Sequence, residues 1–170
     1  FGVSTPTTEL TKQVVDVTRP NVSFDQMTID IYNSRVYLAG KHTWEPITIN
    51  LREDVNNNVQ KLVGEQLQKQ FDFYEQSSAA SGLDYKFATR IEILDGGNGA
   101  NTPTILETFE LYGCYVESAN YNQLAYSAGT EPVTVTLNVR YDNAVQTPQG
   151  TGIGTAIGRT VNTLVTGGGA

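Results

Sequence analysis

The sequence contains few of the residues that carry catalysis or bind metals. Its 170 residues include a single cysteine, Cys114, and a single histidine, His42. A lone cysteine cannot form a disulfide within the chain, and a lone histidine cannot build a histidine-based metal site. Charged residues are also sparse, at 17%, where about a quarter is usual. The sequence therefore predicts no disulfide and no cofactor, and it favours a protein that folds in a reducing compartment.

Basic residues are few compared with acidic ones. Lys and Arg number 11 against 18 Asp and Glu, which gives a net charge of −7. A protein that holds nucleic acid through its phosphates needs basic residues, so ordinary DNA or RNA binding is disfavoured, as is an anionic membrane surface. No apolar run approaches the roughly 20 residues that span a bilayer. No charged and then apolar leader opens the sequence. We expect a soluble protein with no membrane-spanning segment.

Uncharged polar residues, 16 glycines and nine tyrosines fill the remaining sequence and are typical of a sheet-rich protein with many turns. Apolar and polar residues alternate over 24–31, 47–51 and 133–141, as in strands with one buried face. Strand character also marks 87–94 and 104–112. Gly113 follows the last of these, where a bulge or a sharp bend is expected.

One segment has helical periodicity. Apolar residues at 55, 59, 62, 63, 67, 71 and 74 form a single stripe, and Asp54 precedes them as a candidate N-cap. These features predict one long helix over about residues 55–75, packed on an α+β fold. The remainder is expected to form a mostly antiparallel β-sandwich or partial barrel over residues 1–146. Residues 147–170 are rich in Gly and Thr, and we interpret them as a C-terminal tail or an interface arm.

No catalytic constellation is evident, and the chain is predicted not to be an enzyme. His42 has no nucleophile and carboxylate at a recognisable spacing, and Cys114 is expected to be a buried, inert thiol. Two alternatives stay open. The first is a hydrolase built on converging carboxylates, here Glu92, Asp95, Glu107 and Glu110. The second is a ligand-binding β-sandwich with tyrosines as its platform, here Tyr112, Tyr115, Tyr121, Tyr126 and Tyr141.

Several blocks of the sequence, in a fixed order, resemble the major tail tube proteins of contractile-tailed bacteriophages. A strand, an Ala-Gly turn, a basic residue and an aromatic residue that opens the next strand occur in 31–49, after Val-Thr-Arg-Pro at 17–20. A helix with Gln and Phe residues follows at 59–74. A strand ending in Gly spans 109–116, and the last strand runs to 139–144. The resemblance covers residues 14–146, and the start departs from it because no strand precedes residues 14–18.

This resemblance implies a small β-sandwich whose strands join between subunits into a closed barrel. Six subunits would form a ring, and stacked rings would form a hollow tube that conducts viral DNA into the host after the sheath contracts. The implied partners are further copies of the chain, the tail sheath protein, the tape measure protein, and baseplate and tail-terminator proteins. The DNA would pass through the lumen without specific binding. The implied location is the phage virion, with assembly in the host cytoplasm.

Candidate residues follow from these expectations. A charge and a large aromatic side chain at a strand end favour subunit or ring contacts, here Arg35, Lys41, His42 and Trp44. A lumen wall that lets phosphates slide should be acidic and polar, and its candidates are Asp30, Glu92, Glu110, Thr134, Thr136 and Asn138. The same architecture would serve a bacteriocin, a secretion-type contractile injection system or a baseplate tube initiator, and the sequence does not separate these roles.

Overall fold

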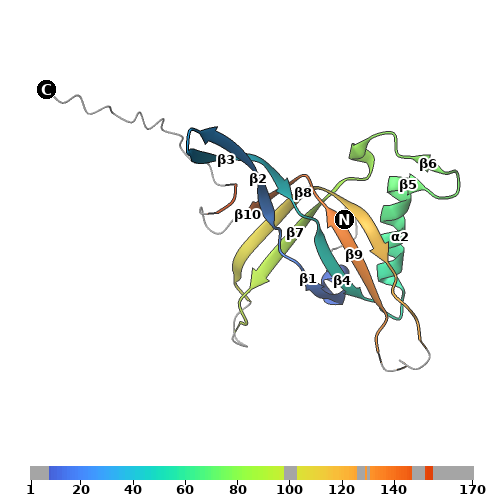
Figure 1. Cartoon of the computed structure of the whole chain (residues 1–170). Helices are drawn as coiled ribbons and strands as arrows, with labels where there is room; N and C mark the ends of the chain where they lie inside the picture. Colours follow the sequence, from blue (N-terminus) through green and yellow to red (C-terminus); the bar gives the residue numbers. More distant parts are fainter. Residues whose placement is uncertain (1–7, 98–102, 126–128, 130, 147–151, 155–170) are drawn as a thin grey trace.

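The computed structural model describes residues 8–97, 103–125, 129, 131–146 and 152–154. Within them the chain forms a curled antiparallel sheet with a helix on one face and a protruding hairpin (Figure 1). The first elements are α1 (Thr8–Gln13), β1 (Val14–Val17), β2 (Val22–Ile31), β3 (Ser34–Trp44), β4 (Ile47–Arg52) and α2 (Asn58–Gln70). The later elements are β5 (Phe71–Asp72), β6 (Ser77–Ser78), a 3-10 turn (Gly82–Asp84), β7 (Phe87–Leu94), β8 (Ile105–Asn120), β9 (Thr134–Arg140) and β10 (Asn143–Gln146).

The main sheet has two wings that share the long strand β8. In one wing β1, β4, β9 and the C-terminal half of β8 pair in that order. In the other wing β7 and β10 pair with the N-terminal half of β8. The wings meet at Gly113, which has φ +68 and lies at a register shift, so the bend predicted from the sequence is confirmed. A side chain at this position would overlap the carboxylate of Asp142.

The core lies on one face of the curled sheet. Alternating residues of β4 and β9 supply its centre, and Ile47, Leu51, Leu137 and Val139 are fully buried there. Helix α2 covers this face with Val59 and Val63, and Leu67 packs at its margin. Alternation over 47–51 and 135–141 therefore marks a buried face in both strands, as predicted, whereas Val133 is exposed.

Helix α2 is shorter than the sequence predicted. It begins at Asn58 and ends at Gln70, whereas the periodicity suggested residues 55–75. Asp54 is not the N-cap. Its carboxylate accepts a hydrogen bond from the Val55 N–H, at 2.8 Å, and Asn57 takes the N-cap position in a left-handed conformation that a helix interior does not allow.

At the other end, the Asp72 carboxylate stops the helix. It accepts hydrogen bonds from the Tyr74 and Glu75 N–H groups and from the Gln68 side chain. These bonds fold residues 72–75 into a turn, and they lower the pKa of Asp72. Tyr74 is therefore exposed, not part of the buried stripe.

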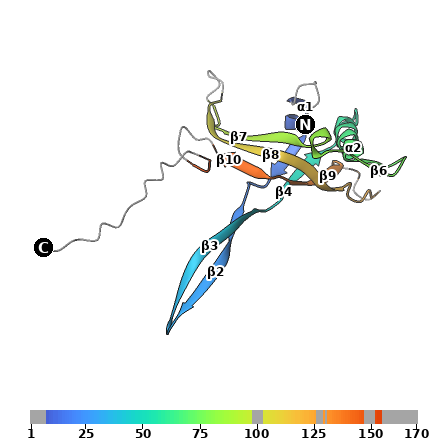
Figure 2. The same ribbon diagram turned by 90° about the horizontal axis from the view of Figure 1, so that it is seen from above.

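Strands β2 and β3 form a hairpin that leaves the body on the side away from α1 and α2 (Figure 2). We call this hairpin the arm. Its turn is at Tyr32 and Asn33. The predicted Ala-Gly turn at 39–40 is instead a bulge inside β3. A Cβ at Gly40 would lie 2.9 Å from the Asp25 carbonyl oxygen, so the close approach of the two strands favours glycine.

Candidate functional site

The wing made of β1, β4, β9 and the end of β8 has an open face of hydroxyl and amide side chains, which we call the polar sheet face. Hydrogen bonds link these side chains across neighbouring strands. Thr136 Oγ1 donates to Asn50 Oδ1, at 2.7 Å, and Thr48 Oγ1 donates to Asn138 Oδ1, at 2.9 Å. Asn138 Nδ2 in turn donates to Ser118 on β8. The face is therefore ordered across its strands and uncharged at its centre.

The charges at the margins of the polar sheet face are balanced. Asp16 accepts a hydrogen bond from Asn50, and Glu117 pairs with Arg140 at 3.4 Å. Arg52 pairs in register with Thr134 and alternates with the buried Leu51, which places it on this face too. Two carboxylates and two guanidinium groups therefore border a neutral centre.

The structure brings together three of the six predicted lumen residues. Thr134, Thr136 and Asn138 lie on the polar sheet face. Glu92 and Glu110 lie on the other wing, where Glu92 pairs with Arg90 and Glu110 accepts a hydrogen bond from Tyr112.

Asp30 lies far from both groups, near the tip of the arm, and pairs with Arg35 at 2.9 Å. The sequence could place each of these residues on the outer face of a strand. It could not show which strands belong to one wing.

The four predicted contact residues all lie on β3 but differ in exposure. Arg35 and Lys41 are exposed, and the ring of His42 lies between those of Phe24 and Trp44, at 6.3 and 6.1 Å. Trp44 is different. It is only 9% exposed and packs against Tyr141 in the core, with ring centroids 5.7 Å apart, so it leaves little surface for a neighbouring subunit. Arg35, Lys41 and His42 remain predicted contact residues.

The arm presents an apolar face that no described part of the chain covers. Met27 pairs with Leu38 and Ile29 with Val36, so their side chains share one side of the hairpin. Met27 is 58% exposed and Ile29 43%. Apolar surface gathered on one side of a ribbon is typical of a contact site.

The acidic residues that suggested a hydrolase are each occupied in structural contacts. Asp95 Oδ1 accepts hydrogen bonds from the Gly97 and Thr104 N–H groups and so holds a turn. Glu107 accepts one from Gln146. In the described part of the chain, no group of three His, Cys, Asp or Glu residues could hold a metal ion.

The structure also accounts for the cysteine and for the tyrosines that suggested a binding platform. Cys114 is fully buried, and burial raises the pKa of its thiol, which agrees with an inert cysteine. Tyr141 belongs to the core, and Tyr115 contacts Tyr85 edge to face. Tyr112 and Tyr121 are exposed, so these tyrosines form no common platform. Tyr126 and the Gly-rich run 155–170 lie outside the described residues. None of the described helices is long and apolar enough to cross a membrane.

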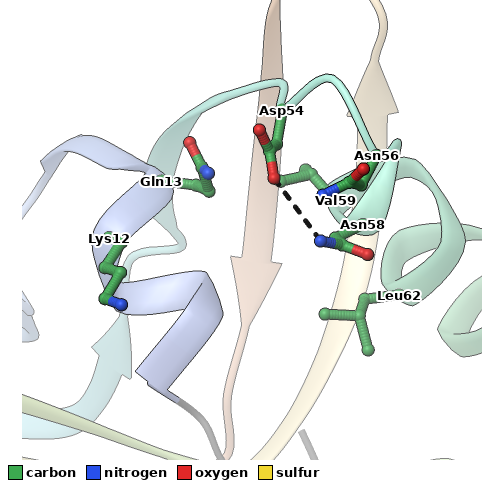
Figure 3. A pocket seen from close by; sticks show the side chains of 7 residues that line it. All are labelled: Lys12, Gln13, Asp54, Asn56, Asn58, Val59 and Leu62. Carbon is green, nitrogen blue, oxygen red and sulfur yellow. Dashed lines mark hydrogen bonds between the residues drawn. The ribbon is translucent and has the colours of Figure 1, made fainter.

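One small pocket lies between the end of α1 and the start of α2 (Figure 3). Asp54, the one carboxylate among the lining residues, is already held by the Val55 N–H and the Asn58 side chain. The acid of this pocket is therefore engaged in holding the start of α2. Its lining residues are Lys12, Gln13, Asp54, Asn56, Asn58, Val59 and Leu62.

Comparison with known proteins finds a similar fold in solved structures. No protein-family model matches the sequence, and no curated protein matches it significantly. Solved structures of contractile systems do match. A chain of the anti-feeding prophage tube-terminating cap is 13% identical, with a TM-score of 0.59, and 79% of this chain and 81% of that one align.

A chain of the sheath–tube complex of the extracellular contractile injection system PVC is 12% identical, with a TM-score of 0.56 over 85% of this chain and 99% of that one. A chain of the anti-feeding prophage baseplate is 10% identical, with a TM-score of 0.58, and the alignment covers 77% and 78%. This is the tail-tube fold. At these identities the likeness shows the fold alone. The mostly antiparallel α+β architecture and the resemblance to tail tube proteins are confirmed.

Proposed function

We propose that this chain is a structural tube subunit of a contractile tail, and not an enzyme. Copies of it would form rings, and the rings would stack into a hollow tube. One observation carries the proposal: the four-stranded wing has a hydrogen-bonded polar face, a buried opposite face, and an open edge on each side. Among the described residues, β1 pairs only with β4, and the C-terminal half of β8 pairs only with β9, so these two strands form the open edges. Open edges are available for pairing with another chain.

The strand directions in the wing allow a closed ring of copies. Neighbouring strands run antiparallel from β1 through β4 and β9 to β8. With four strands per copy, β8 of one copy is antiparallel to β1 of the next. Six copies would supply 24 strands, and barrels of roughly 16 strands or more enclose a channel instead of a filled core. The polar sheet face would then line that channel.

The residues that line the proposed channel bear on what could pass through it. The polar sheet face offers hydroxyl and amide groups with balanced charges at its margins, not the acidic wall expected from the net charge. Two carboxylates match the two arginines of this surface, so it has no excess of basic charge that would hold phosphates, and viral DNA could slide along it. We therefore keep a phage tail tube that conducts DNA as the proposed role. A tube subunit of a bacteriocin or secretion-type contractile injection system, or a baseplate tube initiator, would use the same wall.

The proposed partners are those of a contractile tail: the sheath outside the tube, the tape measure protein inside it, and the baseplate and terminator at its ends. The proposed location is the phage virion after assembly in the host cytoplasm. Support for these partners comes from the fold, since the similar chains belong to a sheath–tube complex, a terminating cap and a baseplate.

Negative-stain electron microscopy of the purified chain at high concentration tests the proposal. We expect rings or tubes of uniform diameter. Sedimentation across a concentration series should show the same assembly in bulk. A chain that stays monomeric at millimolar concentration, alone and with added sheath protein, would contradict a tube role.

A further inference from the structure

The hydrogen bonds at β1 show which of its backbone groups are free. Thr18 donates its backbone N–H to the Thr48 carbonyl, at 3.0 Å. In an antiparallel ladder, alternate residues turn their backbone groups toward the same neighbour. Thr18 and Asp16 therefore turn toward β4, and Val17 turns its N–H and carbonyl toward the open edge.

The same alternation of backbone groups shows which residues of β8 face its open edge. Glu53 donates its N–H to the Val133 carbonyl, at 2.8 Å, which makes Leu51–Val135 and Ile49–Leu137 bonded pairs between β4 and β9. Asn138 therefore turns toward β8, where its register partner is Ser118. The next residue, Ala119, turns its backbone groups away from β9 and toward the open edge.

A side chain from α2 covers this edge at Val116. Gln70 Nε2 donates to the Val116 carbonyl, and the Val116 N–H donates to Gln70 Oε1, both at 2.9 Å. The Gln70 amide therefore satisfies both backbone groups of Val116, as a neighbouring strand would. The edge of β8 that remains open is residues 117–120.

We propose that Gln70 stops the open edge of β8 at Val116, so that β1 of the next subunit pairs with residues 117–120 in a register that places Val17 opposite Ala119. This inference rests on the proposed tube function and assigns its ring contact. The occupant of the edge is a second copy of this chain.

The side-chain faces select this register. Val17 and Ala119 both lie on the core face, because their partners are Ile49 and Leu137. In the proposed register Asp16 comes opposite Asn120 on the polar sheet face. A slip of one residue would turn the Asp16 carboxylate against the core face.

The ends of the contact also agree with this register. Pro20 then reaches the level of Val116. Proline has no N–H to donate, and the groups of Val116 are already taken by Gln70. The ladder therefore ends on both strands at the same point.

Cysteine cross-linking of the full chain tests the register. Asp16→Cys combined with Asn120→Cys places two thiols at a non-bonded pair, where Cα atoms are about 4.5 Å apart, within disulfide range. The matched control is Asp16→Cys with Ser118→Cys, a diagonal pair about 7–8 Å apart and beyond that range. Cys114 is buried and stays in place.

After oxidation of assembled rings, we expect the first pair to give a ladder of linked subunits up to the ring size, with at least ten times the yield of the control. Equal yields, or rings with no cross-link in the first pair, would overturn the register while leaving the tube proposal intact. Absence of rings in the unsubstituted chain would contradict the tube proposal itself.

A second comparison tests the role of Gln70. In a Gln70→Ala background we expect the slipped pair Asp16→Cys with Ser118→Cys to gain cross-linking several-fold, because Val116 is then free to pair. Gln60→Ala, an exposed position on the same helix, should leave that yield unchanged. No gain with Gln70→Ala in rings seen by microscopy would overturn the role of Gln70 as a stop.

Discussion

Two strand pairs in this protein have similar alternation in sequence and opposite surroundings in the structure. Along β4 and β9 the apolar residues are buried against α2 and the rest of the core. Along β2 and β3 four aliphatic residues also share one side, but that side is exposed: Met27, Ile29, Val36 and Leu38. The difference is whether the chain itself supplies a second layer. The described residues supply one for the body and none for the arm.

Periodicity therefore predicts that a strand has a face to bury, and does not identify the chain that buries it. An isolated two-stranded ribbon is marginally stable in water, so an apolar side along the arm favours a contact outside the monomer. In a tube of identical subunits, neighbouring copies are the partners available to every arm.

Leu137→Ala should give the largest loss of stability. Leu137 is fully buried in the core, and removing such a side chain costs about 2–5 kcal/mol. The matched substitution on the arm, Ile29→Ala, should change the free energy of unfolding of the monomer by about 0.5 kcal/mol or less. Urea denaturation of dilute monomer measures both. Similar losses at the two positions would mean that the arm is packed within its own subunit.

Gly113→Ala should give the second largest loss of stability. A left-handed residue with a Cβ costs about 1–2 kcal/mol, and here the methyl group would also displace the Asp142 carboxylate from its 2.6 Å contact with Lys86. Gly64→Ala is the matched control, because nothing lies within 4 Å of the added methyl group. It should stabilise α2 by about 1 kcal/mol. Thermal melting should therefore shift in opposite directions, and a loss at both positions would contradict this account.

Much of the fold could be predicted because it depends on local patterns. The alternation of β4 and β9 and the bend at Gly113 each come from a few adjacent residues. The helix was predicted too long because side-chain hydrogen bonds at Asp54 and Asp72 override an apolar stripe.

The candidate site was harder to predict because it depends on contacts between distant segments. The sequence could not show that Trp44 packs on Tyr141, or that Asp30 lies on the arm while Thr136 lies on the wing. The pairing of Gln70 with Val116 joins residues 46 positions apart and has no local signal. Open edges depend on strand order, which periodicity does not contain.

The arm can also be tested without a change in stability. Ile29→Ser replaces an exposed apolar side chain by a polar one, so melting of the monomer should shift little. Assembly into tubes should be lost, because the apolar side of the arm is the surface that we expect neighbouring copies to cover. Thr28→Ser, on the opposite side of the arm, is the control and should assemble normally. Full-length tubes with Ile29→Ser, seen by negative-stain microscopy, would show that this side makes no essential contact.

The smallest effect should appear at alkaline pH, where a buried tyrosine differs from an exposed one. Burial raises the pKa of Tyr141 to about 12, against an ordinary value of 10.0. The unfolded chain then loses the Tyr141 proton before the folded chain does. The stability due to the neutral phenol is complete below pH 10 and declines as the pH rises from 10 toward 12. Tyr141→Phe should therefore make the unfolding midpoint fall less steeply over this range, with little change at pH 7. Tyr121→Phe, at an exposed position, should leave the slope unchanged. Equal slopes for the unsubstituted chain and Tyr141→Phe would mean that Tyr141 titrates as an exposed tyrosine does.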